Sequence, residues 1–109
     1  MKFGLKDHTV AAIQFRLAHY PHIEEAILYG SRAMGTFRPG SDIDLTLKGE
    51  KLTLSDVFRL ENEIDDLLLP YTFDISIYHQ VSNIDLLDHI RRRGVVFYRK
   101  TDSYQSVER

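Results

Sequence analysis

Three aspartates stand where their carboxylates could share a metal ion. Asp42 and Asp44 are two residues apart in a segment that alternates apolar and polar residues, so both project from one face of a predicted strand. Asp74 occupies the polar face of a later alternating segment. Carboxylates held close together resist joint ionisation, whereas Mg²⁺ binds such oxygens together with phosphate oxygens and water. If the two strands are neighbours, the three side chains could hold two metal ions for an in-line displacement at phosphorus.

An Asp-x-Asp pair alone is short and common, and is more often a solvated strand face. The upstream pair Gly30-Ser31 favours the functional interpretation, because it directly follows a short apolar run. Glycine permits unusual backbone conformations and close approach of a ligand. Ser31 adds a hydroxyl and a backbone N–H that can bind a phosphate oxygen, and a short helix beginning near Arg32 would add further amides. Taken alone, the pair is equally typical of a simple turn that ends a strand.

Three apolar stripes with spacings of three and four residues predict helices. The stripes comprise Val10, Ile13, Leu17 and Tyr20; then Val57, Leu60, Ile64, Leu67 and Leu68; then Ile84, Leu87 and Ile90. The candidate N-caps are Asp7 or Thr9, Thr53 or Ser55, and Ser82 or Asn83. Pro21 and Pro70 follow the first two helices, and Gly94 follows the arginine run at the end of the third.

Strands are predicted between these helices, over Ala26–Tyr29, Asp42–Lys48, the segment around Phe73–Ile77, and Val95–Tyr98. The order of elements predicts an α/β or α+β fold, with a small mixed sheet and helices on its apolar face. The polar face would then carry the three aspartates. Residues 1–99 are expected to form a single domain, and residues 100–109 a flexible C-terminal tail.

Composition excludes several classes of protein. The chain has 109 residues, a net charge of −2 and no cysteine, so disulfides and thiolate metal sites are impossible. The weak charge argues against direct nucleic-acid binding. The first eight residues carry charges where a signal peptide needs apolar residues, and no uncharged apolar run approaches about 18 residues. A cytoplasmic protein without a membrane segment is therefore expected.

Gly30-Ser31, ten intervening residues and Asp42-Ile43-Asp44 together resemble the Gly-Ser-x₁₀-Asp-x-Asp signature of the nucleotidyltransferase superfamily that includes DNA polymerase β. The segment GSRAMGTFRPGSDIDLTL is similar in particular to the minimal nucleotidyltransferases (MNT) of bacteria and archaea. Asp74, in an apolar stretch after a helix, matches the third carboxylate of that family. The resemblance covers about residues 23–98 and implies the palm-like fold of polymerase β.

This resemblance implies transfer of a nucleoside monophosphate, AMP from ATP, to an acceptor hydroxyl, with release of pyrophosphate. Asp42, Asp44 and Asp74 would bind two Mg²⁺ ions, and Asp74 would also take the proton of the acceptor. Gly30 and Ser31 would hold the β- and γ-phosphates, with Arg32 beside them.

Larger relatives carry an additional domain for the acceptor, so a partner protein is expected to supply it here. The resemblance to MNT antitoxins implies a hetero-oligomer with a HEPN-type toxin, which would be modified on a tyrosine. Alternatively, the chain is a non-catalytic antitoxin that neutralises a HEPN partner by complex formation. A transferase for small molecules is a third possibility, which the lack of a second domain disfavours.

The remaining polar residues give weaker signals. Arg32 and Arg38 either contact the triphosphate or the acceptor, or are ordinary surface arginines. The Arg91–Arg93 run is interpreted as a solvated helix end that suits the helix dipole. The histidines lack metal-ligand spacing and are interpreted as surface or core residues; they are His8, His19, His22, His79 and His89. Tyr98 and Tyr104 are interpreted as a strand residue and a tail residue rather than sites of self-modification.

Overall fold

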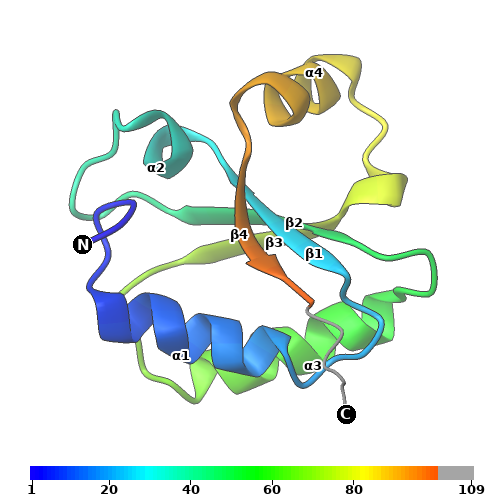
Figure 1. The fold of residues 1–109 in the computed structure, drawn as a ribbon, viewed down its shortest axis with the longest axis horizontal. Coiled ribbons are helices and arrows are strands. Elements are labelled where there is room, and N and C mark those ends of the chain that lie inside the picture. The colour runs from blue at the N-terminus through cyan, green and yellow to red at the C-terminus, as the bar shows by residue number, and fades with distance from the viewer. Residues whose placement is uncertain (101–109) are drawn as a thin grey trace, which may run out of the picture.

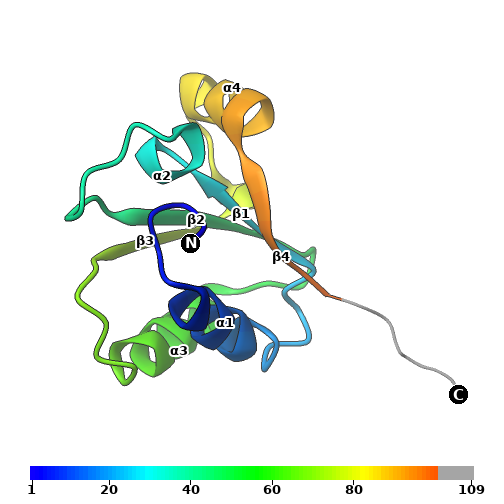
Figure 2. The same ribbon diagram turned by 60° about the vertical axis from the view of Figure 1, so that its left-hand side comes forward.

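The computed structural model describes residues 1–100, which form a four-stranded mixed sheet with helices on both sides (Figures 1 and 2). The elements are α1 (Asp7–Leu17), β1 (Glu25–Tyr29), α2 (Ser31–Met34), β2 (Ile43–Lys48), α3 (Leu54–Asp65), β3 (Phe73–Ile77), the 3₁₀ helix η1 (Tyr78–Gln80), α4 (Ile84–Arg93) and β4 (Val95–Arg99). This order confirms the mixed α/β fold predicted from the sequence. Tyr104 and the predicted tail beyond Lys100 lie outside the described residues.

The strands lie in the order β3-β2-β1-β4. β1 is antiparallel to both β2 and β4, whereas β3 runs parallel to β2. A parallel pair needs a crossover connection, and α3 supplies it. The register places Asp74 opposite Asp44, and Tyr29 opposite Asp44 from the other side.

The main core lies between the sheet and the helices α1 and α3. The alternation predicted for β2 is confirmed, because Ile43, Leu45 and Leu47 are all fully buried in this core. Side chains at the intervening positions project from the opposite face of the sheet, where the Ser76 hydroxyl donates a hydrogen bond to the Thr46 hydroxyl. α1 and α3 therefore cover the apolar face, as predicted.

α4 and α2 lie on the other side of the sheet, where the sequence analysis placed no helix (Figures 1 and 2). α4 packs through Ile90 on Ile27 and Tyr29 of β1, which form a second, small cluster with it. Ile84 was predicted to be buried but is 79% exposed. Ile84 lies two residues before Leu86, which corresponds to a rotation of roughly 200° about the helix axis. Ile84 therefore points away from the side of α4 on which Leu86 and Ile90 pack against the sheet.

Two boundaries also differ from the prediction. α1 has Lys6 as its N-cap without a side-chain hydrogen bond, so neither Asp7 nor Thr9 caps it. α3 ends at Asp65, five residues before Pro70, and the chain turns away through Leu68. Leu68 adopts a positive φ of 54° and is 88% exposed, so it is not part of the buried stripe.

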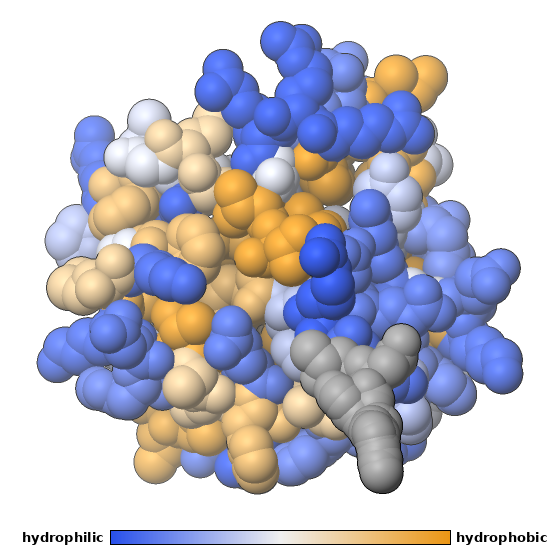
Figure 3. All heavy atoms as spheres, viewed as in Figure 1, coloured by the Kyte–Doolittle hydropathy of each residue, from blue (hydrophilic) through white to orange (hydrophobic). Residues whose placement is uncertain are grey.

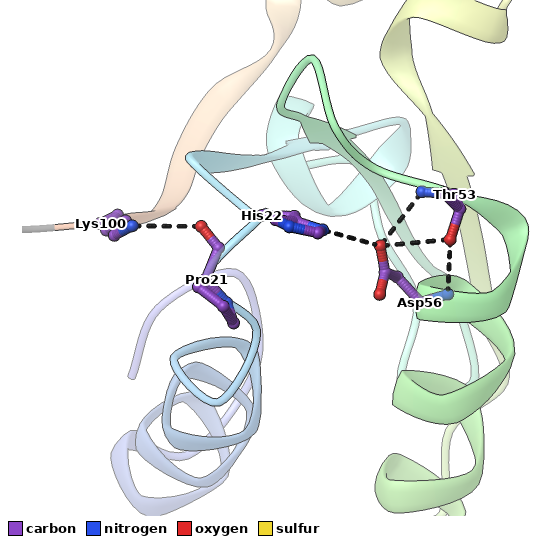
Figure 4. A network of polar contacts seen from close by, with 5 residues as sticks. All are labelled: Pro21, His22, Thr53, Asp56 and Lys100. Atoms are coloured by element: carbon purple, nitrogen blue, oxygen red, sulfur yellow. Dashed lines mark hydrogen bonds and ion pairs between the residues drawn. The ribbon is translucent and has the colours of Figure 1, made fainter.

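The start of α3 is fixed to the loop before β1 (Figure 4). Thr53 and Asp56 form a reciprocal capping box, which confirms Thr53 as the N-cap. His22 lies 3.5 Å from the same Asp56 carboxylate, through Nδ1. Lys100 donates from Nζ to the carbonyl of Pro21 at 3.1 Å.

The surface is divided between apolar and polar regions. Figure 3 shows hydrophobic residues gathered over the middle of one face and hydrophilic residues along its upper edge, where Figure 1 places α4. None of the helices within residues 1–100 combines the length and apolar character that crossing a membrane requires.

Candidate active site

The polar face of β2 and β3 brings the predicted carboxylates into one region. Asp44 and Asp74 are register partners on neighbouring parallel strands, which places their Cα atoms about 4.8 Å apart. Asp42 directly precedes β2 and is exposed, as is Asp74, whereas Asp44 is half-buried. Asp44 and Asp74 therefore lie side by side on neighbouring strands, with Asp42 just before the start of β2.

The electrostatics of Asp44 reflect this crowding. Burial raises the pKa of the Asp44 carboxyl above its ordinary value, and the negative charges of Asp74 and Asp42 raise the pKa further. The positive charge of His89, when its ring is protonated, acts in the opposite direction and lowers the pKa. The Asp44 carboxylate is therefore strained electrostatically, a condition that a bound cation relieves.

Within residues 1–100, no three His, Asp or Glu side chains lie close enough to form a complete metal site by themselves. The donor chemistry nevertheless suits Mg²⁺, because this ion is usually bound through one or two carboxylates together with substrate phosphates and water rather than by an all-protein cage. Asp44 and its two like-charged neighbours supply such oxygens.

Gly30 ends β1 beside these carboxylates. Its φ of 77° and ψ of −157° lie in a region that residues with a side chain rarely adopt. A Cβ added at this position would overlap Oδ2 of Asp44, so the Asp44 carboxylate lies directly against the Gly30 backbone. The requirement for glycine, inferred from the motif, thus has two physical causes.

Ser31 begins the short helix α2, as the sequence analysis allowed. The Gly30 carbonyl accepts from the N–H groups of Ala33 and Met34, which forms the turn. Among the described residues, no acceptor is found for the N–H groups of Ser31 and Arg32. These amides, together with the Ser31 hydroxyl, are the polar groups that this turn offers to a ligand.

Arg32 was predicted to bind nucleotide, but its side chain is 2% exposed and is used within the chain. The guanidinium donates to the carbonyls of Phe3, Ser41 and Pro39 at 2.9, 3.0 and 3.2 Å. It also lies over the rings of Tyr71 and Phe37, at 4.9 and 5.4 Å from their centroids. The Arg32 side chain therefore shapes the loop that leads to Asp42, whereas Arg38 on the same loop is exposed.

His89 on α4 was not recognised as a site residue from the sequence. The backbone N–H of Gly30 donates to Nε2 of His89 at 3.0 Å. The His89 ring also meets the ring of Tyr29 edge-on, with 6.1 Å between centroids. Lack of metal-ligand spacing gave no reason to select this histidine, but its position three residues after Leu86 and one before Ile90 places it on the inner side of α4. That helical spacing was the available signal.

A hollow of about 230 Å³ adjoins His89. Its lining residues are Asp85, Asp88, His89, Arg92 and Arg93. Part of the arginine run is engaged locally, because Arg92 pairs with Asp88 at 3.4 Å and Arg91 donates to the Tyr78 hydroxyl at 3.3 Å. A larger hollow, of about 390 Å³, lies between α3 and the start of β3 and contains none of the predicted site residues.

Comparison with known proteins places this geometry in context. A sequence profile of the family described as "Polymerase beta, Nucleotidyltransferase" matches residues 12–103. Among curated proteins, none matches the sequence of this chain.

Several solved structures share the fold. A toxin–antitoxin complex with AMP-PNP superposes with a TM-score of 0.66 at 18% identity, over 88% of this chain and 75% of the other. A tri-AMPylated Shewanella oneidensis HEPN toxin in complex with MNT antitoxin gives 0.63 at 16% identity, over 88% and 74%. A putative nucleotidyltransferase from Sulfolobus solfataricus gives 0.53 at 18% identity, over 84% and 77%. At such identities the similarity concerns the fold.

Proposed function

This chain belongs to the polymerase β nucleotidyltransferase family, and we propose that it transfers AMP from ATP to a hydroxyl group of a partner protein. The observation that carries the proposal is the pairing of Asp44 with Asp74 on adjacent strands, directly beside the glycine turn at Gly30. In this reaction the acceptor oxygen bonds to the α-phosphorus while the bond to pyrophosphate breaks. Reactions of this type depend mostly on positioning and charge neutralisation.

The roles of the residues follow from their placement. Asp42, Asp44 and Asp74 are the proposed ligands of two Mg²⁺ ions. When bound, such ions neutralise phosphate charge and stabilise the attacking and leaving oxygens. Asp74, exposed on the edge strand β3, is placed to hold the proton released by the acceptor hydroxyl. Gly30 and Ser31 form the turn that receives the β- and γ-phosphates, and the Arg32 side chain holds the adjoining loop.

The proposed acceptor is a HEPN-type toxin, with which this chain would form a hetero-oligomer as its antitoxin. The support is the fold, which is shared with the antitoxin of a complex whose HEPN toxin is tri-AMPylated. Use of ATP also fits the cytoplasmic location expected from the sequence.

A transfer assay tests the proposal. The protein is incubated with labelled ATP, Mg²⁺ and the proposed acceptor, a HEPN-type protein encoded by the adjacent gene. Label on that acceptor is measured. The double variant Asp42→Asn/Asp44→Asn should lose at least about a hundredfold in rate, because it removes carboxylates that would bind the ions that neutralise charge in the transition state. The matched control is Asp65→Asn/Asp66→Asn, which changes two exposed aspartates at the end of α3 and should retain the rate. Equal labelling by both double variants would refute the assigned site.

A second candidate function is neutralisation of the toxin by complex formation alone. The similar structures favour it to the extent that they are complexes of an antitoxin with its toxin. The same double variant separates the two functions. Full protection of cells from the toxin by Asp42→Asn/Asp44→Asn supports binding alone, whereas loss of protection with retained complex formation supports transfer.

A further inference from the structure

Two side chains from different elements converge on the backbone of Gly30. The Asp44 carboxylate of β2 lies against its Cα, where no Cβ would fit. The imidazole of His89, 59 residues further along the chain, accepts its N–H at 3.0 Å. The conformation between these contacts has a φ of 77°. The turn is therefore held from two sides in a conformation that glycine adopts readily and residues with a side chain do not.

We infer that His89 is a positioning residue for nucleotide transfer: it fixes the Gly30 amide, and thereby sets the direction in which the Ser31 amide and hydroxyl face the phosphates. The inference rests on the proposed function, because it assigns α4 a role in that same site. His89 acts through Gly30 and is not itself placed among the groups that contact the reacting phosphate.

The hydrogen-bonding arrangement explains why a histidine suits this position. Nε2 can accept the Gly30 N–H only when the ring is neutral and its proton lies on Nδ1. With Nε2 as its acceptor, the Gly30 N–H points towards α4, which leaves Ser31 as the first residue whose amide is open to a ligand. A half-buried N–H that loses its acceptor costs free energy and favours rearrangement of the turn.

Packing holds the imidazole in place. The His89 ring meets Tyr29 edge-on, and the next residue, Ile90, is buried with Ile27 and Tyr29 in the small cluster between α4 and β1. Tyr29 immediately precedes Gly30, so the same helix face that packs on the end of β1 also binds the first residue of the turn. The position of α4 and the conformation of the turn are thus coupled by two adjacent contacts.

Nuclear magnetic resonance tests the contact directly. In the wild type, a through-hydrogen-bond ¹⁵N–¹⁵N coupling is expected between the Gly30 amide and His89 Nε2. His89→Gln offers an oxygen acceptor near the position of Nε2, whereas His89→Leu has a similar size but no acceptor. His8→Leu is the matched control, because His8 is exposed on α1, across the sheet from α4. His89→Leu should shift the amide signals of both Gly30 and Ser31, and His89→Gln should shift them much less.

Titration with ATP and Mg²⁺ measures the consequence for the site. His89→Leu should weaken binding by about tenfold, the scale expected when a half-buried donor loses its partner. His89→Gln and His8→Leu should remain within about threefold of the wild type. Thermal unfolding of each variant shows whether the fold is retained.

The two readouts separate failure of this inference from failure of the proposed function. Absence of the ¹⁵N–¹⁵N coupling, or an unchanged Ser31 signal in His89→Leu, overturns the inference whether or not ATP binds. Tighter ATP binding by His89→Leu also overturns it, because His89 would then compete with the phosphates for Gly30. If the wild type shows the ¹⁵N–¹⁵N coupling and His89→Leu shows the shifted Ser31 signal, but the wild type does not bind ATP, the inferred contact stands and the proposed transfer fails.

Discussion

At the scale of single residues, two glycines in the site region share a positive φ but differ in ψ, which is −157° at Gly30 and 8° at Gly35, and in their surroundings. Gly30 and Gly35 have φ values of 77° and 80°, but only Gly30 has a carboxylate against its Cα. An alanine at Gly35 meets nothing within 4 Å, so the backbone conformation is its main cost. An alanine at Gly30 must displace Asp44 and must also adopt a backbone region almost confined to glycine, so both costs apply there.

Gly35→Ala should therefore lower the free energy of unfolding by about 1 kcal/mol, and Gly30→Ala by about 2 kcal/mol more because overpacking adds to its less favourable backbone region. Urea denaturation measures both. In an Asp44→Ala background the additional loss at Gly30 should shrink to the backbone part, since the displaced carboxylate is gone. Equal losses for the two glycine variants would show that Asp44 does not crowd Gly30.

The raised pKa of the Asp44 carboxyl predicts that the stability of the fold depends on pH. Burial first, and then Asp74 and Asp42, raise the pKa of Asp44 in the folded state above its ordinary value of 3.8. A raised pKa contributes stability that is complete below pH 3.8 and is lost as pH rises through the folded value. In the presence of a chelator, Asp44→Asn should therefore be more stable than the wild type at pH 7, and this advantage should fade below pH 4.

Thermal unfolding at pH 3.5 and pH 7 measures this difference. Added Mg²⁺ should raise the unfolding temperature of the wild type and have little effect on Asp44→Asn, because a ligand that binds the folded state stabilises it. Destabilisation by Asp44→Asn at pH 7 without metal would contradict the direction of the pKa shift.

At the scale of residues, the sequence could indicate some candidate site residues but not others. Asp42, Asp44, Asp74 and Gly30 could be selected because motif spacing and strand alternation are local properties. The burial of the Arg32 side chain could not be predicted, since it depends on carbonyls and rings contributed by three separate segments of the chain. His89 was missed because its partner is 59 residues away and is a backbone group, which no side-chain motif records.

At the scale of elements, periodicity was informative where one side of an element is buried along its whole length. The stripes of α1 and α3 and the alternation of β2 were predicted on this basis and confirmed. Ile84 and Leu68 were assigned wrongly because both lie at helix ends, where packing stops before the apolar pattern does. The sequence also could not place α4 over β1, since that position depends on the strand order.

The pairing of α1 with α3 provides a prediction for alkaline pH. The Tyr20 hydroxyl, just after α1, donates to the Glu63 carboxylate of α3. Burial, together with the hydrogen bond to Glu63, raises the pKa of Tyr20 from 10.0 to about 12. This contribution to stability is complete below pH 10 and is lost as pH rises towards 12.

Tyr20→Phe should therefore be less stable than the wild type by about 1 kcal/mol at neutral pH, the typical contribution of one hydrogen bond. The difference should shrink between pH 10 and pH 12, because only the wild type loses this contact there. Urea denaturation at pH 7, 10 and 11.5 measures the difference. A constant gap across this range would show that the Tyr20–Glu63 contact does not titrate as expected.

At the scale of the whole molecule, the two faces of the sheet are packed unequally. α1 and α3 share a large buried cluster with the sheet, whereas α4 is held mainly by Ile90 against Ile27 and Tyr29. Regions with few buried apolar contacts open at lower free energy than the global transition. α4 is therefore expected to open locally while the rest of the sheet remains folded.

Native-state hydrogen exchange measures this opening. Ile90→Ala should accelerate exchange of the α4 amides while those of α1 and α3 keep their protection. Leu60→Ala, in the main core, should instead lower the global free energy of unfolding by about 2–5 kcal/mol and accelerate all the protected amides. Uniform acceleration by Ile90→Ala would show that α4 unfolds only with the whole domain.

The strand order also has a consequence during synthesis. β1 lies between β2 and β4, and its first residue, Glu25, pairs with Arg99, 74 residues later. A ribosome exposes Gly30, the three aspartates and most of the main core before α4 and β4 have emerged, and Phe97 of β4 joins that core last. Until then β1 has an open edge, and the Gly30 turn lacks its partner on α4. The Gly30 turn therefore cannot gain its contact with His89 before α4 has emerged.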